Sequence, residues 1–338
     1  MMVLGKWTLI LSVAALLIGG CNSSDDQAPE PLQGDPSALV EQDSFTQPGH
    51  DETDVTINSL YGTYLNAGPE SPIVIIVPGS GPTDRDGNNG FMVSNSLKYL
   101  AEGLADKNIS SIRVDKRGLF GSQAAGDANA VTVDIYAADY RAWVEKATDL
   151  SKQECVFLLG HSEGGLMVSA AAIGQDNVCG VILIAAPGRP MQDVLREQLK
   201  SNPANTLMLE DAEAAISALE LGQYIDVSAY HPALKGLFNP ALQGYLISLF
   251  SFDLADVLSR VNQPALIIQG EHDIQVKLED AQRLADKSGE QLVVVPKLNH
   301  VLKTAPTNRL ANIQLYNSPN TPIDQTVIDV TASFIEKN

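Results

Sequence analysis

A short turn at residues 160–164 constrains this chain more than any other feature. Its sequence is Gly-His-Ser-Glu-Gly, and it lies directly between an apolar run at residues 156–159 and an alanine-rich helical stretch. Such a sharp turn needs glycine at both ends, because a side chain there would collide with the neighbouring backbone. It would also lift Ser162 out of the carboxyl end of the strand. The pattern therefore predicts a strand, a turn and a helix within a helix-covered sheet.

Further apolar runs, separated by helical patterns, extend this unit into a sheet. Continuous apolar runs such as residues 73–77 are typical of strands covered on both faces. Alternation of strands and helices predicts a mostly parallel α/β sheet with helices on both faces. The alternating residues 55–65 predict an antiparallel strand pair at the edge. The predicted parallel strands are residues 73–77, 111–114, 156–159, 181–184, 265–268 and 291–295, and the predicted helices include 94–107, 134–149 and 323–336.

The strand pattern stops between residues 187 and 260. Only helical patterns occur there, for example at residues 190–199 and 241–250. We expect a helical insertion that covers the sheet's carboxyl edge as a cap.

The N-terminal segment, residues 1–20, has the features of an export signal. Lys6 supplies a positive charge, residues 7–18 are apolar, and small residues lead to Cys21. This pattern resembles the lipobox of bacterial lipoproteins, which implies cleavage before Cys21 and lipidation of that cysteine. An ordinary secretory signal or an uncleaved anchor are the alternatives. Asn22, in place of aspartate, implies by the same resemblance the outer membrane of a Gram-negative cell envelope.

Residues 21–52 are expected to be an acidic, disordered tether before a folded body at residues 53–338. From Asn22 to Asp54 there are nine acidic residues and no lysine or arginine. Such a segment buries too little apolar surface to fold. The net charge of −19 argues against nucleic acid as a partner, since no basic cluster is present to neutralise phosphates.

The serine in the turn needs a base and an orienting acid to become a nucleophile. The chain has five histidines. Positions in the tether, inside the turn and in the helical insertion exclude three of them as the base, namely His50, His161 and His231. His300 follows the predicted strand 291–295, in a loop where open α/β sheets gather their catalytic groups. His272 is the less favoured base.

Asp273 is the favoured acid, because it follows the preceding predicted strand in the matching loop. The order Ser162, Asp273, His300 is that of nucleophile, acid and base in α/β-hydrolases. Glu271 is the less favoured acid.

Taken together, these motifs resemble the bacterial α/β-hydrolases near the serine aminopeptidase and esterase group, from about residue 70 to the C-terminus. The resemblance implies that the backbone N–H groups of Ser80 and Glu163 bind the oxyanion, with Gly81 as an alternative donor. Proline at position 78 departs from the family's more common histidine. The segments that carry the resemblance are residues 78–86, 113–118, 160–165, 270–276 and 299–300.

Cys155 and Cys179 lie at the starts of two predicted strands that would be neighbours. Export places the body where a disulfide can persist. We expect a Cys155–Cys179 disulfide, and two buried thiols are the alternative.

Residues 84–89 resemble a calcium loop only superficially, because the glycine is misplaced and Asn95 stands where the closing glutamate should be. We predict no metal and no cofactor. Asp84, Asp86 and Arg117 are expected to brace the loops around the site.

Three functions remain open from the sequence. The first is hydrolysis of small-molecule acyl esters through an acyl-enzyme on Ser162. The second is a peptidase or amidase that cleaves short peptides with the same three residues. The third is a catalytically idle lipoprotein that only binds at the cell surface, and the complete set of three residues argues against it.

Overall fold

The structure is a computed structural model that describes residues 51–338. The predicted signal segment, Cys21 and nearly all of the predicted tether lie outside the described residues. Within the described part of the chain, no helix has the length and apolar character needed to cross a membrane.

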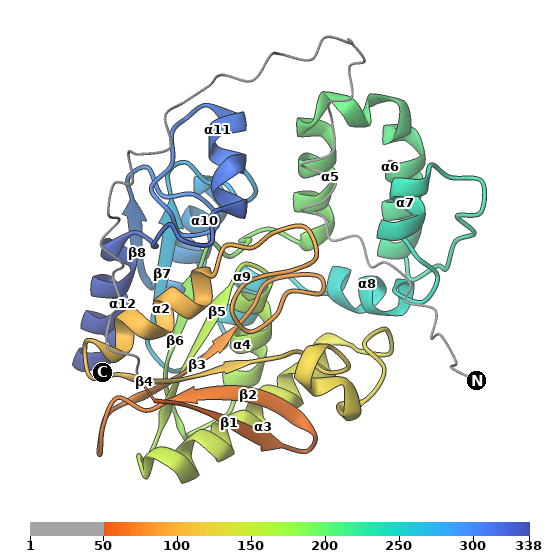
Figure 1. The fold of residues 1–338 in the computed structure, drawn as a ribbon. Coiled ribbons are helices and arrows are strands. Elements are labelled where there is room, and N and C mark those ends of the chain that lie inside the picture. Colours follow the sequence, from red (N-terminus) through yellow and green to blue (C-terminus); the bar gives the residue numbers. More distant parts are fainter. Residues whose placement is uncertain (1–50) are drawn as a thin grey trace, which may run out of the picture.

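An eight-stranded sheet forms the centre of the molecule, with the order β1-β2-β4-β3-β5-β6-β7-β8 (Figure 1). β2 pairs antiparallel with both β1 and β4, and all other neighbours are parallel. The predicted α/β fold class is confirmed. The strands are β1 (Glu52–Ile57), β2 (Leu60–Leu65), β3 (Ile73–Val77), β4 (Ser110–Val114), β5 (Val156–His161), β6 (Val178–Ile184), β7 (Ala265–Gly270) and β8 (Gln291–Val295).

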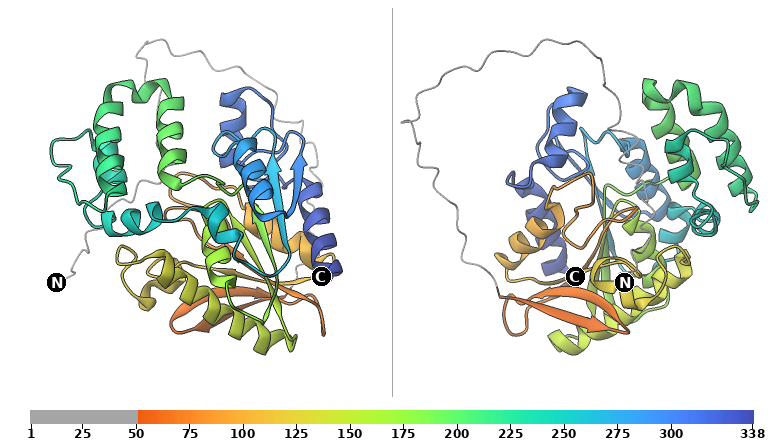
Figure 2. Two further views of the ribbon diagram at one scale, coloured as in Figure 1. Left: turned by 180° about the vertical axis from the view of Figure 1, so that it is seen from behind. Right: turned by 45° about the vertical axis from the view of Figure 1, so that its right-hand side comes forward.

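Helices cover both faces of the sheet, which explains why the central strands are apolar throughout. All residues of β3, β4 and β5 are buried. One face packs against α2 (Ser96–Ala105) and α12 (Gln325–Lys337). The other packs against α3 (Val133–Ser151), α4 (Gly164–Ala172), α9 (Leu254–Leu258) and α10 (Leu278–Ser288), as the two views of Figure 2 show.

The segment between β6 and β7 contains only helices, which lie over the carboxyl edge of the sheet as a cap (Figure 1). The last helix of this segment, α9, packs against α4 and α10. It therefore belongs to the helix layer that covers the sheet and not to the cap. The cap elements are α5 (Met191–Ser201), η2 (Pro203–Met208), α6 (Leu209–Glu220), α7 (Pro232–Leu237) and α8 (Gln243–Phe250). The remaining short elements are η1 (Phe120–Ala125), α11 (Arg309–Gln314) and η3 (Leu315–Asn317).

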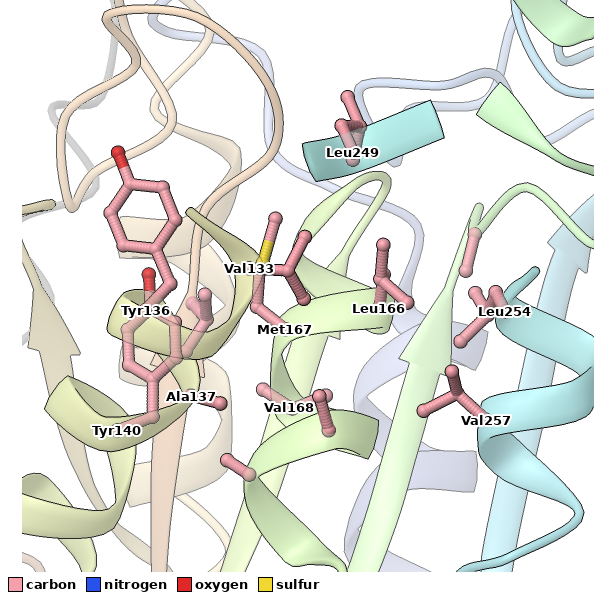
Figure 3. Close-up of a cluster of buried hydrophobic side chains, with 14 of the residues drawn as sticks. Val133, Tyr136, Ala137, Tyr140, Leu166, Met167, Val168, Leu249, Leu254 and Val257 are labelled. Atoms are coloured by element: carbon pink, nitrogen blue, oxygen red, sulfur yellow. The ribbon is translucent and has the colours of Figure 1, made fainter. Parts of the chain in front are cut away.

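Helix α8 packs apolar side chains of the cap onto the body. Figure 3 shows Leu249 of α8 above a cluster formed by α3 and α4, which includes Tyr136 and Met167. Burial of such apolar side chains contributes about 25 cal/mol per Å².

Cys155 and Cys179 form a disulfide with a Cα–Cα distance of 5.2 Å. The bond joins the residue before β5 to the second residue of β6, two strands that pair directly. It therefore lies at the amino ends of these strands, away from the turn at their carboxyl ends.

Candidate active site

The turn after β5 holds Ser162 in a strained conformation. Its φ angle is 55°, and its backbone N–H donates to the carbonyl of Ile184 at 2.8 Å. A side chain on Gly160 would collide with the backbone of Gly164, and one on Gly164 would lie 2.7 Å from the Val77 carbonyl oxygen. Glycine is thus required at both positions, and the turn can expose the serine only with this pattern.

Asp273 and His300 are joined by a hydrogen bond, although they come from loops after different strands. Nδ1 of His300 donates to Oδ2 of Asp273 at 2.8 Å. A carboxylate only accepts, so the proton is on Nδ1 and the lone pair of Nε2 is left to accept a proton. The carboxylate is fully buried and the imidazole nearly so.

The Asp273 carboxylate is held by three further donors. The backbone N–H groups of Gln275 and Val276 donate to Oδ1 at 2.7 and 3.0 Å. The amide of the buried Gln269 donates to Oδ2 at 3.3 Å. These contacts fix the carboxylate in the orientation that His300 requires.

His161 supports His300 from inside the turn. Nε2 of His161 lies 2.8 Å from the backbone oxygen of His300, and the two ring centroids are 4.9 Å apart. The carbonyl can only accept, so Nε2 of His161 carries the hydrogen. Burial, reinforced by the neighbouring His300, lowers the pKa of His161 to about 3. His161 is therefore a neutral donor at physiological pH.

The turn that carries Ser162 is thus attached to the loop of His300, since its neighbour His161 contacts His300. Among residues 51–338, the hydroxyl of Ser162 itself makes no hydrogen bond. The two less favoured residues have other partners. Nδ1 of His272 contacts the Ala305 carbonyl at 2.6 Å, and the exposed Glu271 accepts from the Lys297 N–H.

Two buried asparagines tie together the loops that carry the acid and the base. Nδ2 of Asn299 donates to Oδ1 of Asn312 at 3.1 Å, and Nδ2 of Asn312 donates to the His272 carbonyl at 2.9 Å. Oδ1 of Asn299 also accepts from the Lys303 N–H at 3.0 Å. The base loop is thereby anchored on both sides of His300.

Two backbone N–H groups beside the serine are free to bind an anion. Neither the N–H of Ser80 nor that of Glu163 donates to any acceptor among the described residues. The same holds for Gly81, and all three residues line one pocket together with Ser162.

A buried lysine holds the loop that contains Ser80. Nζ of Lys116 donates to the carbonyl of Gly79 at 2.6 Å and to that of Gly81. Burial lowers the pKa of Lys116 to about 8, while the Glu163 carboxylate acts in the opposite direction. Burial also raises the pKa of Glu163, against the effects of Lys116 and of a hydrogen bond from the Tyr245 hydroxyl at 2.6 Å.

The pocket over Ser162 is mainly apolar, and the cap supplies most of its walls. Among the described residues that line it, the only charged side chain is that of Glu163. Gln198, Gln275 and the Tyr245 hydroxyl are the other polar side chains besides the serines. The apolar lining from the cap is Met191, Val194 and Leu195 of α5 and Leu237, Leu242, Leu246, Leu249 and Phe250 of α7, α8 or the turn between them, and Pro187 and Val276 complete it.

The loop of residues 84–89 is braced differently from the expectation. Asp84 accepts from backbone N–H groups within its own loop, and Asp86 pairs with Arg113 at 2.9 Å. Arg117 pairs with Asp139 of α3 and donates to the Ala125 carbonyl, so it braces the segment after β4 and not the loop of residues 84–89. Within residues 51–338, no cluster of three or more His, Cys, Asp or Glu side chains could hold a metal ion.

Sequence reasoning missed the supporting roles of His161, Lys116, Tyr245 and Asn312. Only Lys116 carries a local signal, because it lies two residues after β4, at the same edge of the sheet as the turn. The contacts of the other three depend on tertiary packing.

The comparison with protein families decides the family. The family described as serine aminopeptidase, S33, matches residues 90–304, which is more than half of the chain and includes Ser162, Asp273 and His300. The chain belongs to this serine aminopeptidase S33 family. It is therefore a serine hydrolase, and the family resemblance deduced from its motifs is confirmed.

Proteins similar to this chain include esterases and a peptidase. Esterase EstD of Thermotoga maritima is 28% identical over 309 residues, which cover 88% of this chain and 69% of the esterase.

Three solved structures share the α/β-hydrolase fold with this family member. Est1E of Butyrivibrio proteoclasticus with ferulic acid has a TM-score of 0.53 at 17% identity, over 84% of this chain and 98% of that one. The Pyrococcus furiosus esterase Pf2001 has a TM-score of 0.53 at 15% identity, over 86% and 91%. Proline iminopeptidase of Mycobacterium smegmatis has a TM-score of 0.52 at 18% identity, over 85% and 98%. At these identities the likeness concerns the fold.

Proposed function

We propose that the protein is a carboxylester hydrolase for esters with apolar acyl groups. Ser162 is the nucleophile, His300 the general base and Asp273 the residue that orients the base. The observation that carries this proposal is the Asp273–His300 hydrogen bond of 2.8 Å, which leaves Nε2 of His300 able to accept a proton beside the exposed turn.

The reaction follows from these positions. His300 takes the proton as Oγ of Ser162 attacks the acyl carbonyl, and Asp273 stabilises the resulting imidazolium. The hydrogen bond between Ser162 and His300 forms when substrate binds, since catalytic hydrogen bonds are often long in ligand-free enzymes. His300 then protonates the leaving alcohol, and a water molecule activated by the same imidazole releases the acid.

The oxyanion of the tetrahedral intermediate is bound by the N–H groups of Ser80 and Glu163. Both N–H groups lack an acceptor within the described chain and belong to residues that line the pocket with Ser162. Loss of one such donor costs roughly 3 kcal/mol in the barrier.

The pocket favours an ester over an aminopeptidase substrate. An aminopeptidase needs a carboxylate to bind the substrate's ammonium group. The only charged side chain lining the described pocket is Glu163, and its carboxylate already binds the Tyr245 hydroxyl and attracts Lys116. An apolar acyl chain, in contrast, matches the aliphatic walls from α5 and α8. The similarity to esterase EstD supports the same choice.

The deciding experiment compares p-nitrophenyl esters of increasing chain length with aminoacyl p-nitroanilides. We expect ester cleavage with a kcat/KM at least 100-fold above that for any anilide. A fluorophosphonate probe should label the wild type but not Ser162→Ala. A preference for anilides would establish the peptidase function instead. An unlabelled wild type that cleaves no ester would leave the idle binding lipoprotein.

We also propose that the mature protein is lipid-anchored in the cell envelope through Cys21, at the outer membrane of a Gram-negative cell. The lipobox-like segment before Cys21 and the acidic residues after it support this location. Mass spectrometry of the N-terminal peptide should find diacylglycerol on Cys21. Cys21→Ser should move the protein from the membrane fraction to the soluble fraction, and an unmodified Cys21 in the wild type would refute the anchor.

A further inference from the structure

Lys116 determines the direction of the Ser80 N–H. Its ammonium group donates to the carbonyl oxygen of Gly79 at 2.6 Å, and this carbonyl belongs to the same peptide unit as the Ser80 N–H. No peptide bond in the described chain is cis. In a trans peptide unit the N–H points away from the C=O. Since Lys116 holds the carbonyl, the N–H of Ser80 points away from the lysine.

The loop held in this way lies against the proposed nucleophile. A side chain on Gly79 would place its Cβ 3.0 Å from Cβ of Ser162. Ser80 and Ser162 also line the same pocket. Lys116 therefore holds a loop that lies against Ser162, although the lysine itself is buried and does not line the pocket.

Tyr245 connects Glu163, the residue of the second proposed oxyanion donor, to the cap. The buried Glu163 carboxylate attracts Lys116 and accepts a hydrogen bond of 2.6 Å from the Tyr245 hydroxyl on α8. The attraction to Glu163 partly offsets the effect of burial on the pKa of Lys116. A second link fixes α8 nearby, because Oγ of Ser248 accepts from the Val133 N–H at 3.1 Å.

We propose that Lys116 is a positioning residue for the oxyanion-binding N–H of Ser80, and that Tyr245 of the cap positions Glu163, whose backbone N–H is the second oxyanion donor. The inference rests on the proposed esterase function. It assigns to the cap a role in transition-state binding, in addition to the walls of the acyl pocket. It also explains why a lysine and a glutamate are buried beside an otherwise apolar pocket.

The first test measures kcat and KM with p-nitrophenyl butyrate, and the Ki of a trifluoromethyl ketone that forms a tetrahedral adduct with Ser162. Lys116→Met removes the donors and should lower kcat on the order of 100-fold. Tyr245→Phe removes one hydroxyl, keeps the ring in the pocket and should lower kcat roughly 10-fold. KM should change less than about twofold, because substrate binding in the pocket is retained. The Ki should rise in proportion to the loss in kcat/KM.

Tyr99→Phe is the matched control, since Tyr99 also donates a 2.6 Å hydrogen bond, to the Pro319 carbonyl on the α2 side of the molecule. It should leave kcat unchanged. A Tyr245→Phe enzyme with wild-type kcat and Ki would overturn the inference. If the Lys116→Met variant does not fold, the Tyr245→Phe variant alone decides the test. Failure of the esterase proposal looks different, because the wild type would then cleave no ester at all.

A second readout is the pH dependence of kcat. Several titratable groups surround the lysine. Glu163 attracts Lys116, and the hydroxyl-bearing rings of Tyr245 and Tyr136 lie near Glu163. Asp115, the residue before the lysine, is paired with Arg85. Burial raises the pKa values of both tyrosines, so they stay neutral. With the pKa of Lys116 at about 8, kcat should fall as the pH rises through this value. Glu163→Gln removes the stabilising charge and should move this fall to lower pH; an unmoved profile contradicts the inference.

Discussion

Nε2 of His161 donates a hydrogen bond of 2.8 Å to the backbone carbonyl of His300, across a sequence separation of 139 residues. The turn that carries Ser162 is thereby attached to the loop that carries the proposed base. Asp273 holds the imidazole of His300 through a hydrogen bond from Nδ1. The position of His300 relative to Ser162 is thus set by a contact through the main chain, independently of any bond between serine and histidine.

His161→Phe should lower kcat roughly 10- to 100-fold, because a displacement of about 1 Å can cost a factor of 100. The ring is kept, but the donor to His300 is lost. His161→Gln supplies an amide donor and should recover part of the activity. Steady-state kinetics with a nitrophenyl ester, at equal folded protein by circular dichroism, check this. Equal kcat in His161→Phe and the wild type would show that the contact does not position the base.

The same histidine should make the fold sensitive to acid. Its pKa is lowered to about 3 in the folded state, against about 6.5 in the unfolded chain. Between these values the unfolded chain binds the additional proton. His161 therefore contributes full stability above about pH 6.5, and this contribution is lost as the pH falls toward 3.

Urea unfolding at pH 7.5 and pH 5.5 tests this dependence. The free energy of unfolding should drop by about 1 kcal/mol per pH unit below 6.5 from this residue. His161→Phe cannot take up the proton and should show a smaller drop. Parallel curves for both proteins would assign the acid sensitivity to other groups.

The fold and the order of the proposed catalytic residues could be predicted because they depend on local patterns. β8 (Gln291–Val295) matches its predicted range, since a run of apolar β-favouring residues specifies a strand without tertiary information. The loop positions of Asp273 and His300 then follow from the parallel topology. Neither inference needs a side-chain contact.

The supporting contacts could not be predicted for the opposite reason. Tyr245 is one residue of an apolar helix, and only the packing of α8 on the body directs its hydroxyl to Glu163. Likewise, no local sequence pattern indicates that Arg117 pairs with Asp139 of α3. Short helices such as α7 (Pro232–Leu237) and α11 (Arg309–Gln314) also contain too few turns for a periodic signal.

The apolar pocket should make the enzyme prefer esters with longer acyl chains, and a substitution in the pocket should change this preference. Each buried methylene contributes about 0.8 kcal/mol, so kcat/KM should rise at least 10-fold from acetate to hexanoate. Leu246 of α8 lines the pocket, and Leu246→Trp should fill it, lowering kcat/KM for hexanoate roughly 10-fold with little effect on acetate. Leu221→Trp, at a side chain 74% exposed outside the pocket, is the control. An equal loss for both esters would place the acyl chain elsewhere.

The Cys155–Cys179 disulfide should stabilise the nucleophile segment without taking part in catalysis. It closes a loop with a sequence separation of 24 that contains β5, the Ser162 turn and α4. Restriction of the unfolded chain by a loop of this size is worth about 3 kcal/mol. The bond lies at the amino ends of the strands, so replacing both cysteines with serine should leave kcat at 25 °C unchanged.

Denaturant unfolding with and without dithiothreitol tests this account. The wild type should lose about 2–4 kcal/mol of unfolding free energy when the bond is reduced, and the double serine variant should show the lower value under both conditions. A wild type that does not respond to reductant, while its two thiols react with an alkylating reagent, would mean that the native protein keeps them reduced. A loss of kcat in a fully folded variant would instead show that the bond influences the Ser162 turn through β5, which joins the two sites directly.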